Sequence, residues 1–427
     1  MKNILIFFSL ALGTFVFSSI ALDSQLRTGI VAQIQELQAG QGVTNNTNQQ
    51  ASAFFVPTAS VETLKEKYRI ATTQAEKKIR LLIMPGHEPK SGGAEYRNLK
   101  EREMAVELTG YLTDFIQNNH QYETIVPRSN TGWSKTFDTY FSEHMGGIKA
   151  FVSKQKAAMS THVQSGTIKK PVTEVYHADA ATEAALRIYG INKWSNENNI
   201  DVAIHIHFND YPRSKQKLPG KYTGFTMYIP DHQYSNSSTS RAIAESIKGR
   251  MSHYYATSTF EQESSGIVED QELIAIGAEN SIDAPSILIE YGYMYQTEFQ
   301  DATSRSVILK DMAYQTYLGI QDFFAGNKTG VSSVQDSSLF PYTWTRTISK
   351  KTKETPETIR DLLALQTVFV KEGLFPTDAC PRTGGFGPCT TKALAQFQKK
   401  YGIQGEDGVV GVQTQKKLNS MYSVESI

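Results

Sequence analysis

The sequence predicts an α/β protein with a mostly parallel sheet covered by helices on both faces, plus a small all-α C-terminal domain of three helices. Apolar segments rich in β-branched residues alternate with amphipathic segments between residues 79 and 325. Several of these apolar segments are continuous, as is typical of parallel strands buried on both faces. Beyond residue 356 only short helical patterns occur, which predicts the second domain over residues 356–423.

The N-terminus has the pattern of a secretory signal peptide over residues 1–21. Lys2 precedes the apolar run ILIFFSLALGTFVF, and the small residues Ser19 and Ala21 form a cleavage site. The run is shorter than the roughly 20 residues that a membrane span needs, so an uncleaved anchor is the less favoured alternative. We therefore expect a secreted or cell-envelope protein, in the periplasm or cell wall, with no stable membrane partner.

Residues 22–78 predict an N-terminal helical segment and linker. A short helical pattern, LRTGIVAQIQELQA, runs into the polar segment AGQGVTNNTNQQASA. The segment VETLKEKYRIATTQAEKK then predicts a helix that leads into the first core strand.

The predicted α/β domain over residues 79–325 contains five strand segments, namely IRLLIMPG, TIVP, DVAIHIHFN, GFTMYIP and SILIEYGYM. Helices are predicted at KEREMAVELTGYLTDFIQ, AATEAALRIYGINKWSN and TSRAIAESIKGRMSHYY. Residues 129–175 show no sustained period and are interpreted as an insertion of helices and loop.

Residues 326–355 are predicted to be a linker to the three-helix domain. In that domain the segment ETIRDLLALQTVFVKEGL has its apolar residues on one side of a predicted helix. A weak repeat begins at Gly387 and again at Gly411, and each copy opens with Gly-x-x-Thr. The domain contains no catalytic constellation of its own, which favours a binding module.

The charge balance and the cysteine content limit the possible binding partners and covalent cross-links of the chain. The 43 basic and 43 acidic residues balance, so no global field attracts nucleic acid, and we expect no nucleic-acid partner. The only two cysteines, Cys380 and Cys389, bracket a short loop and predict one local disulfide. A two-cysteine metal site is the weaker alternative because no histidine lies near them in sequence.

Two candidate residues follow the first strand. His87 comes directly after a Pro-Gly turn, where α/β sheets bind ligands at the carboxyl ends of strands, although a loop histidine without a role is the simpler interpretation. Glu101 opens the next helix, where a carboxylate often serves only to complement the helix dipole.

Two further candidates lie on core strands. Period two places His205, His207 and Asn209 on one strand face, with His207 nearer the carboxyl end. Glu290 stands inside an otherwise apolar strand, so it either pairs with a nearby Arg or Lys or has a chemical function. Two histidines, one glutamate and a further glutamate suffice for a catalytic zinc site with one position open for water.

These motifs resemble those of the zinc-dependent N-acetylmuramoyl-L-alanine amidases. MPGHEPKSGGAEYRNLKERE is similar to the family's opening motif, HIHFN to its His-x-Asn motif, and APSILIEYGYM to its late Pro-x-x-Leu-x-Glu-x-Gly motif. The resemblance covers about Ile79 to Phe324, and it implies that His87, Glu101 and His207 bind Zn²⁺ and that Glu290 is the catalytic carboxylate.

The chain departs from the family pattern at three places. Glu88 stands where the family usually has glycine, His205 stands where serine is usual, and the insertion after Ser129 is longer than the family minimum. His205 is expected either to compete for the metal or to support His207 by a hydrogen bond, and Asn209 is a second candidate for a supporting role.

The C-terminal residues resemble a three-helix peptidoglycan-binding domain. LLALQTVFVKEGL, GGFGPCTTKALAQFQKKYGI and GVVGVQTQKKL carry its Leu-Gln, Phe-Gly-Pro-x-Thr and Phe-Gln signatures. Together the two resemblances imply hydrolysis of the amide between N-acetylmuramic acid and L-alanine, with peptidoglycan as the partner. A zinc peptidase acting on the stem peptide, and a non-catalytic wall-binding protein with a degenerate site, are the alternatives.

Overall fold

The computed structural model describes residues 59–423, apart from residues 75, 171–174, 176, 178–179, 211–212, 214–217 and 327–334. The predicted signal peptide, the first helical pattern and the polar segment after it lie outside the described residues. Residues Pro57–Ile427 belong to one compact unit. Each helix in the described part of the chain is too short or too polar to cross a bilayer.

A six-stranded sheet forms the centre of the first domain, in the order β4-β1-β5-β8-β6-β7. Its strands are β1 (Ile79–Pro85), β4 (Tyr122–Ile125), β5 (Val202–Asn209), β6 (Thr226–Pro230), β7 (Ile267–Asp270) and β8 (Ser286–Tyr293). All neighbouring pairs are parallel except β6 and β8. The five predicted strands are confirmed, and β7 is a sixth that the sequence did not predict.

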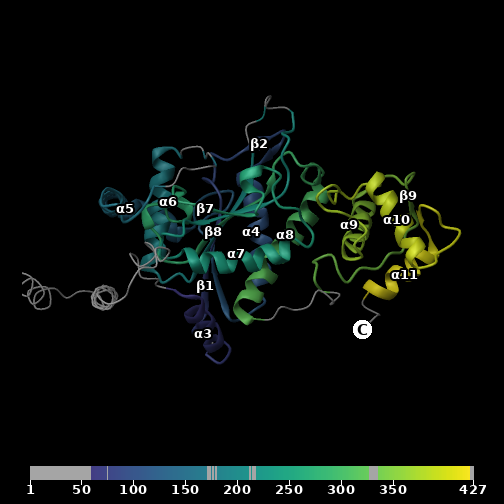
Figure 1. Ribbon diagram of the computed structural model, residues 1–427, viewed down its shortest axis with the longest axis horizontal. Coiled ribbons are helices and arrows are strands. Elements are labelled where there is room, and N and C mark those ends of the chain that lie inside the picture. The colour runs from purple at the N-terminus through teal and green to yellow at the C-terminus, as the bar shows by residue number, and fades with distance from the viewer. Residues whose placement is uncertain are drawn as a thin grey trace, which may run out of the picture. The chain divides into compact units, whose positions relative to one another are not determined.

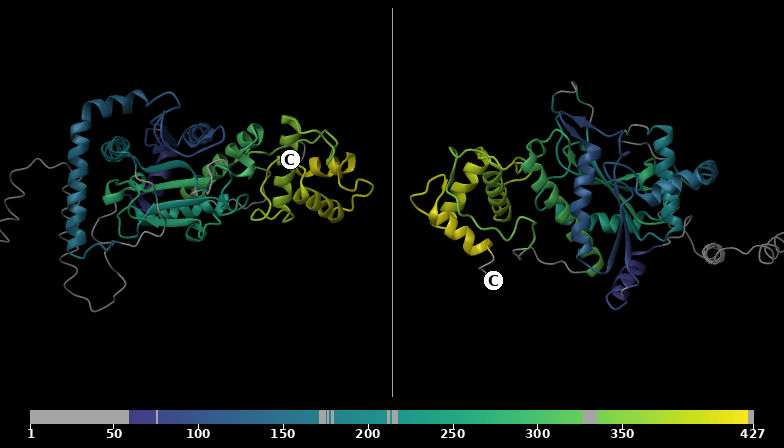
Figure 2. Two further views of the ribbon diagram at one scale, coloured as in Figure 1. Left: turned by 90° about the horizontal axis from the view of Figure 1, so that it is seen from above. Right: turned by 180° about the vertical axis from the view of Figure 1, so that it is seen from behind.

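Helices cover both faces of this sheet, which confirms the predicted layers. One face packs against α3 (Val61–Ala71), α4 (Glu101–Gln117), α7 (Ser237–Met251) and α8 (Ala302–Ala325). The other face packs against α5 (Lys135–Gln164) and α6 (Thr182–Glu197). Figures 1 and 2 show α5 and α6 on the opposite side of the sheet from α4 and α8. Short 3₁₀ helices lie at Glu261–Glu263 (η2), Ile274–Ile276 (η3), Ala278–Asn280 (η4) and Thr297–Phe299 (η5).

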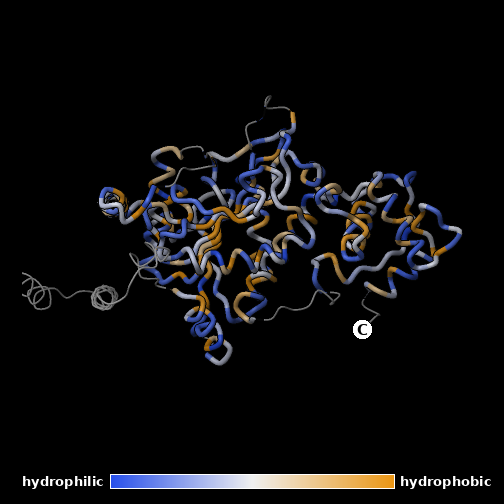
Figure 3. Tube along the Cα trace, in the orientation of Figure 1, coloured by the Kyte–Doolittle hydropathy of each residue, from blue (hydrophilic) through white to orange (hydrophobic). Residues whose placement is uncertain are grey.

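The strands divide their side chains between the two layers. Leu81 and Ile83 of β1 pack with α4 and α8, whereas Leu82 and Met84 pack with α5 and α6. Figure 3 shows hydrophobic residues concentrated along these central strands. Because both faces are buried, the strands are continuously apolar, as the sequence pattern indicated.

The insertion after Ser129 consists mainly of the 30-residue helix α5. Phe137, Phe141 and Ile148 are its buried residues and pack toward α6, while most of the helix surface is exposed. The segment was predicted to hold helices and loop, and its described residues hold loop and one long helix, α5, instead of several helices.

The second domain contains α9 (Pro356–Lys371), α10 (Pro388–Lys400) and α11 (Val412–Tyr422). Its three helices are confirmed, and a small two-stranded sheet, β9 (Ile348–Ser349) with β10 (Val409–Val410), accompanies them. The linker predicted over residues 326–355 is shorter than expected, because Phe340, Trp344 and Ile348 are buried in the core of this domain. These three residues recur at every fourth position, but the segment that carries them is not helical, so a search for amphipathic helices or strands did not reveal their burial.

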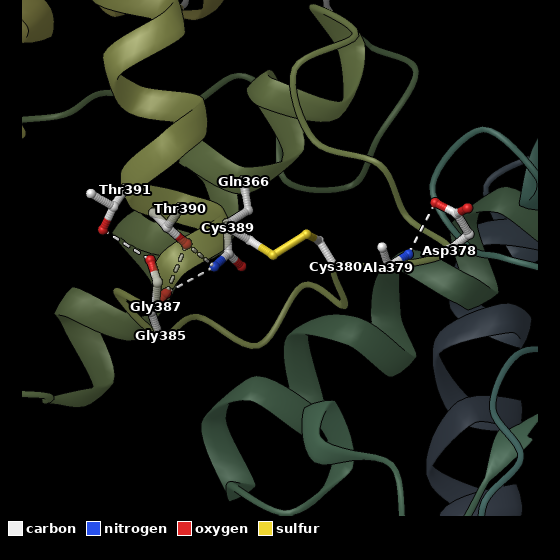
Figure 4. Close-up of a disulfide and its surroundings, with 9 residues drawn as sticks. All are labelled: Gln366, Asp378, Ala379, Cys380, Gly385, Gly387, Cys389, Thr390 and Thr391. Carbon is white, nitrogen blue, oxygen red and sulfur yellow. Dashed lines mark hydrogen bonds between the residues drawn. A yellow bond between two sulfur atoms is a disulfide. The ribbon is translucent and has the colours of Figure 1, made fainter.

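One disulfide and one buried ion pair fix the loop before α10. Cys380 and Cys389 are joined, as predicted, next to a hydrogen bond from Gln366 to Thr390 (Figure 4). From the same loop, Arg382 donates to Asp311 of α8 at 2.9 Å, and both side chains are almost fully buried. The guanidinium also lies over the rings of Tyr254 and Tyr255, so this contact ties α8 and the loop together in a region closed to solvent.

Replacing Arg382 with methionine should lower the free energy of unfolding by about 3–5 kcal/mol, because Asp311 then remains buried without its cation. Urea denaturation of the full chain measures this loss. Arg69→Met is the matched control, because Arg69 and its partner Glu66 are both exposed and should leave the transition unchanged. Equal transitions for the two variants would contradict a stabilising role for the buried pair.

Candidate metal centre

The predicted site residues gather at the carboxyl ends of β1, β5 and β8. β5 is the central strand, with Pro85 of β1 in register with Ile206 and with His207 in register with Glu290 of β8. His87 follows β1 by two residues, so all three parallel strands contribute to one end of the sheet.

The turn after β1 brings its backbone very close to β5. A Cβ atom at Gly86 would lie 2.4 Å from the His207 ring, so only glycine fits at this position. His87 itself has φ 67°, a left-handed conformation that is uncommon for residues with a side chain. The turn thus places the His87 ring against His207, with 4.8 Å between the ring centroids.

Arg128 holds this turn in place, and sequence reasoning missed it. Its guanidinium is buried and donates to the carbonyl oxygens of Pro85, Gly86 and Arg102. Burial lowers the pKa of Arg128 to about 10. Since these acceptors are backbone atoms, no sequence motif marks them, and only the position of Arg128 just after β4, the neighbour of β1, hinted at its role.

Glu101 is buried at the first position of α4 and is fixed from two sides. Oε2 accepts from the backbone N–H of Ala94 at 2.8 Å, and Oε1 accepts from that of Phe208 at 3.1 Å. The hairpin of β2 (Glu95–Tyr96) and β3 (Leu99–Lys100) joins the first of these donors to the helix. Glu101 is therefore more than a helix-start carboxylate, because its buried side chain accepts hydrogen bonds from the loop before β2 and from β5.

His87, Glu101 and His207 converge on one point. Oε1 of Glu101 lies 2.8 Å from Nε2 of His87 and 3.0 Å from Nδ1 of His207. The three ligand atoms all lie within 4.8 Å of one another, and tetrahedral zinc bonds of about 2.0–2.1 Å place neighbouring ligands at a comparable separation. His87 Nε2 is buried, and its contact with the Glu101 carboxylate lacks hydrogen-bond geometry, so the donor set suits a bound metal ion.

Burial and charge act in opposite directions at this cluster. Burial lowers the pKa of His207, which keeps the imidazole in the neutral form that binds metals. Burial alone would raise the pKa of Glu101, but the two histidines outweigh it, and this pKa lies below its usual range. A neutral imidazole and an ionised carboxylate are the forms needed for coordination.

Glu290 lies beside this cluster without a cation. Its Oε2 is buried and has no hydrogen-bond partner, and no Arg or Lys of the described residues forms an ion pair with it. Burial raises the pKa of Glu290 well above its usual range, and the nearby Glu101 and Glu263 carboxylates add to the rise. The alternative of a structural ion pair therefore finds no support among the described residues.

Comparison with known proteins identifies the first domain. The family model described as N-acetylmuramoyl-L-alanine amidase matches residues 81–322. The chain belongs to this amidase family. A second model, described as putative peptidoglycan binding domain, matches residues 360–418 of the amidase, within its C-terminal domain.

Solved structures similar to this amidase include the CwlD amidase from Clostridioides difficile in complex with the GerS lipoprotein, at 15% identity and a TM-score of 0.38, covering 58% of this chain and 100% of that one. The N-acetylmuramyl-L-alanine amidase Ami1 from Mycobacterium smegmatis has 12% identity and a TM-score of 0.38, covering 58% and 98%. No curated protein sequence matches the chain.

Of the departures from the family pattern, Glu88 has an ion-pair partner, whereas Nε2 of His205 is buried without a hydrogen-bond partner. Glu88 forms an ion pair with Arg187 of α6 at 2.9 Å, which links the turn after His87 to the second helical layer. His205 lies deeper on β5, outside the three-residue cluster, and burial lowers its pKa to about 3. Its supporting role therefore stays a prediction, as does that of Asn209, whose side chain donates to Glu263.

A second cluster of possible ligands, Asp231, His232 and Glu269, lies at the ends of β6 and β7. Glu269 already pairs with Arg241, and His232 is mostly exposed. The cation beside Glu269 makes this cluster a poor metal site, but a useful control.

We expect the full chain to bind one zinc ion, and His207→Ala to weaken that binding at least about 100-fold, because it removes one of three protein ligands. Titration calorimetry and metal analysis after dialysis measure both quantities. His232→Ala should leave zinc content unchanged. Equal loss in the two variants would contradict the assignment of the metal to the cluster around Glu101.

Proposed function

We propose that this amidase uses zinc to hydrolyse the amide between the lactyl group of N-acetylmuramic acid and the L-alanine of the stem peptide. The observation that carries the proposal is the convergence of three metal-binding atoms beside Glu290, a partly buried residue whose Oε2 is buried and has no hydrogen-bond partner. Family membership supports the amide as the bond and peptidoglycan as the substrate.

His87, Glu101 and His207 would hold the zinc ion, which when bound supplies Lewis acidity that polarises the amide carbonyl and acidifies water. Glu290 accepts the proton of the attacking water as the new C–O bond forms. It then returns that proton to the nitrogen of L-alanine as the C–N bond breaks.

The backbone around the site keeps these groups in place. Ala94 and Phe208 hold Glu101 through their N–H groups, and Arg128 holds the turn that carries His87. Such fixed geometry reduces the rearrangement needed at the moment of reaction.

The C-terminal domain is proposed to hold the enzyme on its insoluble substrate. Its match to a peptidoglycan-binding family supports this role, and action on peptidoglycan supports a location outside the cytoplasm. This location agrees with the signal peptide predicted over residues 1–21.

Glu290→Gln should reduce the turnover number by about 10²–10⁴-fold, because general acid–base catalysis contributes about that factor, while zinc content stays unchanged. Mass spectrometry of digested peptidoglycan measures the products: an amidase releases intact stem peptides from the glycan. Glu298→Gln is the matched control, since Glu298 is also buried with a raised pKa but lies outside the cluster.

Shortened stem peptides would instead support the zinc peptidase. Protein that carries no zinc and is unaffected by a chelator would support the non-catalytic wall-binding alternative. Full activity of Glu290→Gln would remove Glu290 from the mechanism.

The inactive Glu290→Gln chain should still sediment with insoluble peptidoglycan as strongly as the wild type, because binding by the C-terminal domain does not need the proton acceptor. A pull-down assay with purified wall measures the bound fraction. Loss of sedimentation in this variant would show that retention depends on the catalytic site instead.

A further inference from the structure

Glu263, at the end of η2, is a second buried carboxylate next to the metal centre, with an exposed fraction of 1%. Its Oε1 accepts from Asn209 Nδ2 at 3.0 Å and from the Tyr228 hydroxyl at 2.7 Å. Its Oε2 accepts from the Ser258 hydroxyl at 2.6 Å and the Tyr293 hydroxyl at 2.8 Å. Four donors thus surround one carboxylate.

These donors come from the strands that form the site. Asn209 ends β5, Tyr228 lies on β6, and Tyr293 ends β8, so Glu263 links the strands on both sides of Glu290. A simple structural brace would account for the three hydroxyl groups, which are all buried. It does not account for Asn209, which is partly exposed.

The position of Asn209 on β5 suggests that its side chain contacts the substrate. It lies two residues beyond His207 on the same face of β5, which is also the face of Glu290. Its Nδ2 is occupied by Glu263, so the planar carboxamide is held in place and its Oδ1 is the remaining acceptor atom. No described residue donates to this Oδ1, which leaves an oriented acceptor at the edge of the metal centre.

We propose that Glu263 is a positioning residue for the amidase reaction. It holds the Asn209 carboxamide so that Oδ1 accepts a hydrogen bond from a peptide N–H of the stem, beside the bond to be cut. This inference rests on the proposed function, since the stem peptide is the ligand that brings such an N–H group to the site. A carboxylate held by four donors is rigid enough to fix a neighbouring amide.

Glu263→Gln tests the proposal in the full, zinc-loaded chain, because it replaces one acceptor oxygen with an NH₂ group that faces donors. We expect kcat/KM on soluble muropeptides to fall about 10²-fold, the cost of a small misplacement of substrate. Zinc content and thermal midpoint are measured alongside, and Glu298→Gln again serves as the buried-glutamate control. Unchanged kcat/KM in Glu263→Gln overturns the inference.

A double-mutant cycle separates positioning from general support of the fold. If Glu263 acts through Asn209, the double variant Asn209→Ala/Glu263→Gln should be no slower than the slower single variant. Effects that multiply would show that the two residues act independently, and would overturn the inference. Asn209→Ala removes one of the four donors to Glu263 and keeps the other three. If Glu263→Gln fails to fold, this variant alone tests the inference. It too must lower kcat/KM, and full activity overturns the inference.

The activity of the wild type distinguishes a failure of this inference from a failure of the proposed function. Release of intact stem peptides by the wild type, with unaffected Glu263 and Asn209 variants, overturns the positioning role alone. Absence of any such release by zinc-loaded wild type overturns the proposed function and the positioning role together.

Discussion

The register of β5 between β1 and β8 is the constraint on which the candidate site depends. Parallel neighbours end at the same edge of the sheet, so His87, His207 and Glu290 meet there although they lie far apart along the chain. A slip of one residue would turn His207 to the opposite helical layer and separate it from Glu290. The continuous apolar character of these strands, buried on both faces, therefore fixes the site as well as the fold.

Sequence patterns predicted most of this architecture because they follow burial directly. Period two placed His207 and Asn209 on one face of β5, and the structure has the same arrangement. β7 escaped prediction because IVED is short and half polar at the edge of the sheet. The linker boundary was misplaced because Phe340 and Trp344 belong to a non-helical segment that packs into the core of the second domain, and no helix or strand pattern marks such a segment.

The supporting residues of the site were beyond sequence reasoning for a different reason. Arg128 contacts backbone carbonyl oxygens about 40 residues earlier in the chain, and any residue type supplies such an oxygen. Glu263 gathers donors from several separate elements, none at a fixed spacing from it. Metal ligands are recognisable by residue type, whereas residues that hold a turn or an amide are recognisable only by their contacts.

The buried Glu263 and the partly buried Glu290, both beside the metal centre, show how hydrogen-bond partners decide the role of a carboxyl group. Glu263 has four donors, so its burial costs little and its oxygens are committed to the structure. Glu290 has a buried oxygen with no partner, a costly arrangement that folding stability alone would not favour. An unsatisfied carboxyl group next to three converging ligand atoms is accounted for by a reaction that gives it a proton. Removing donors from Glu263 should therefore disturb the positions of the groups around the site. Replacing Glu290 should instead remove the group that transfers the proton.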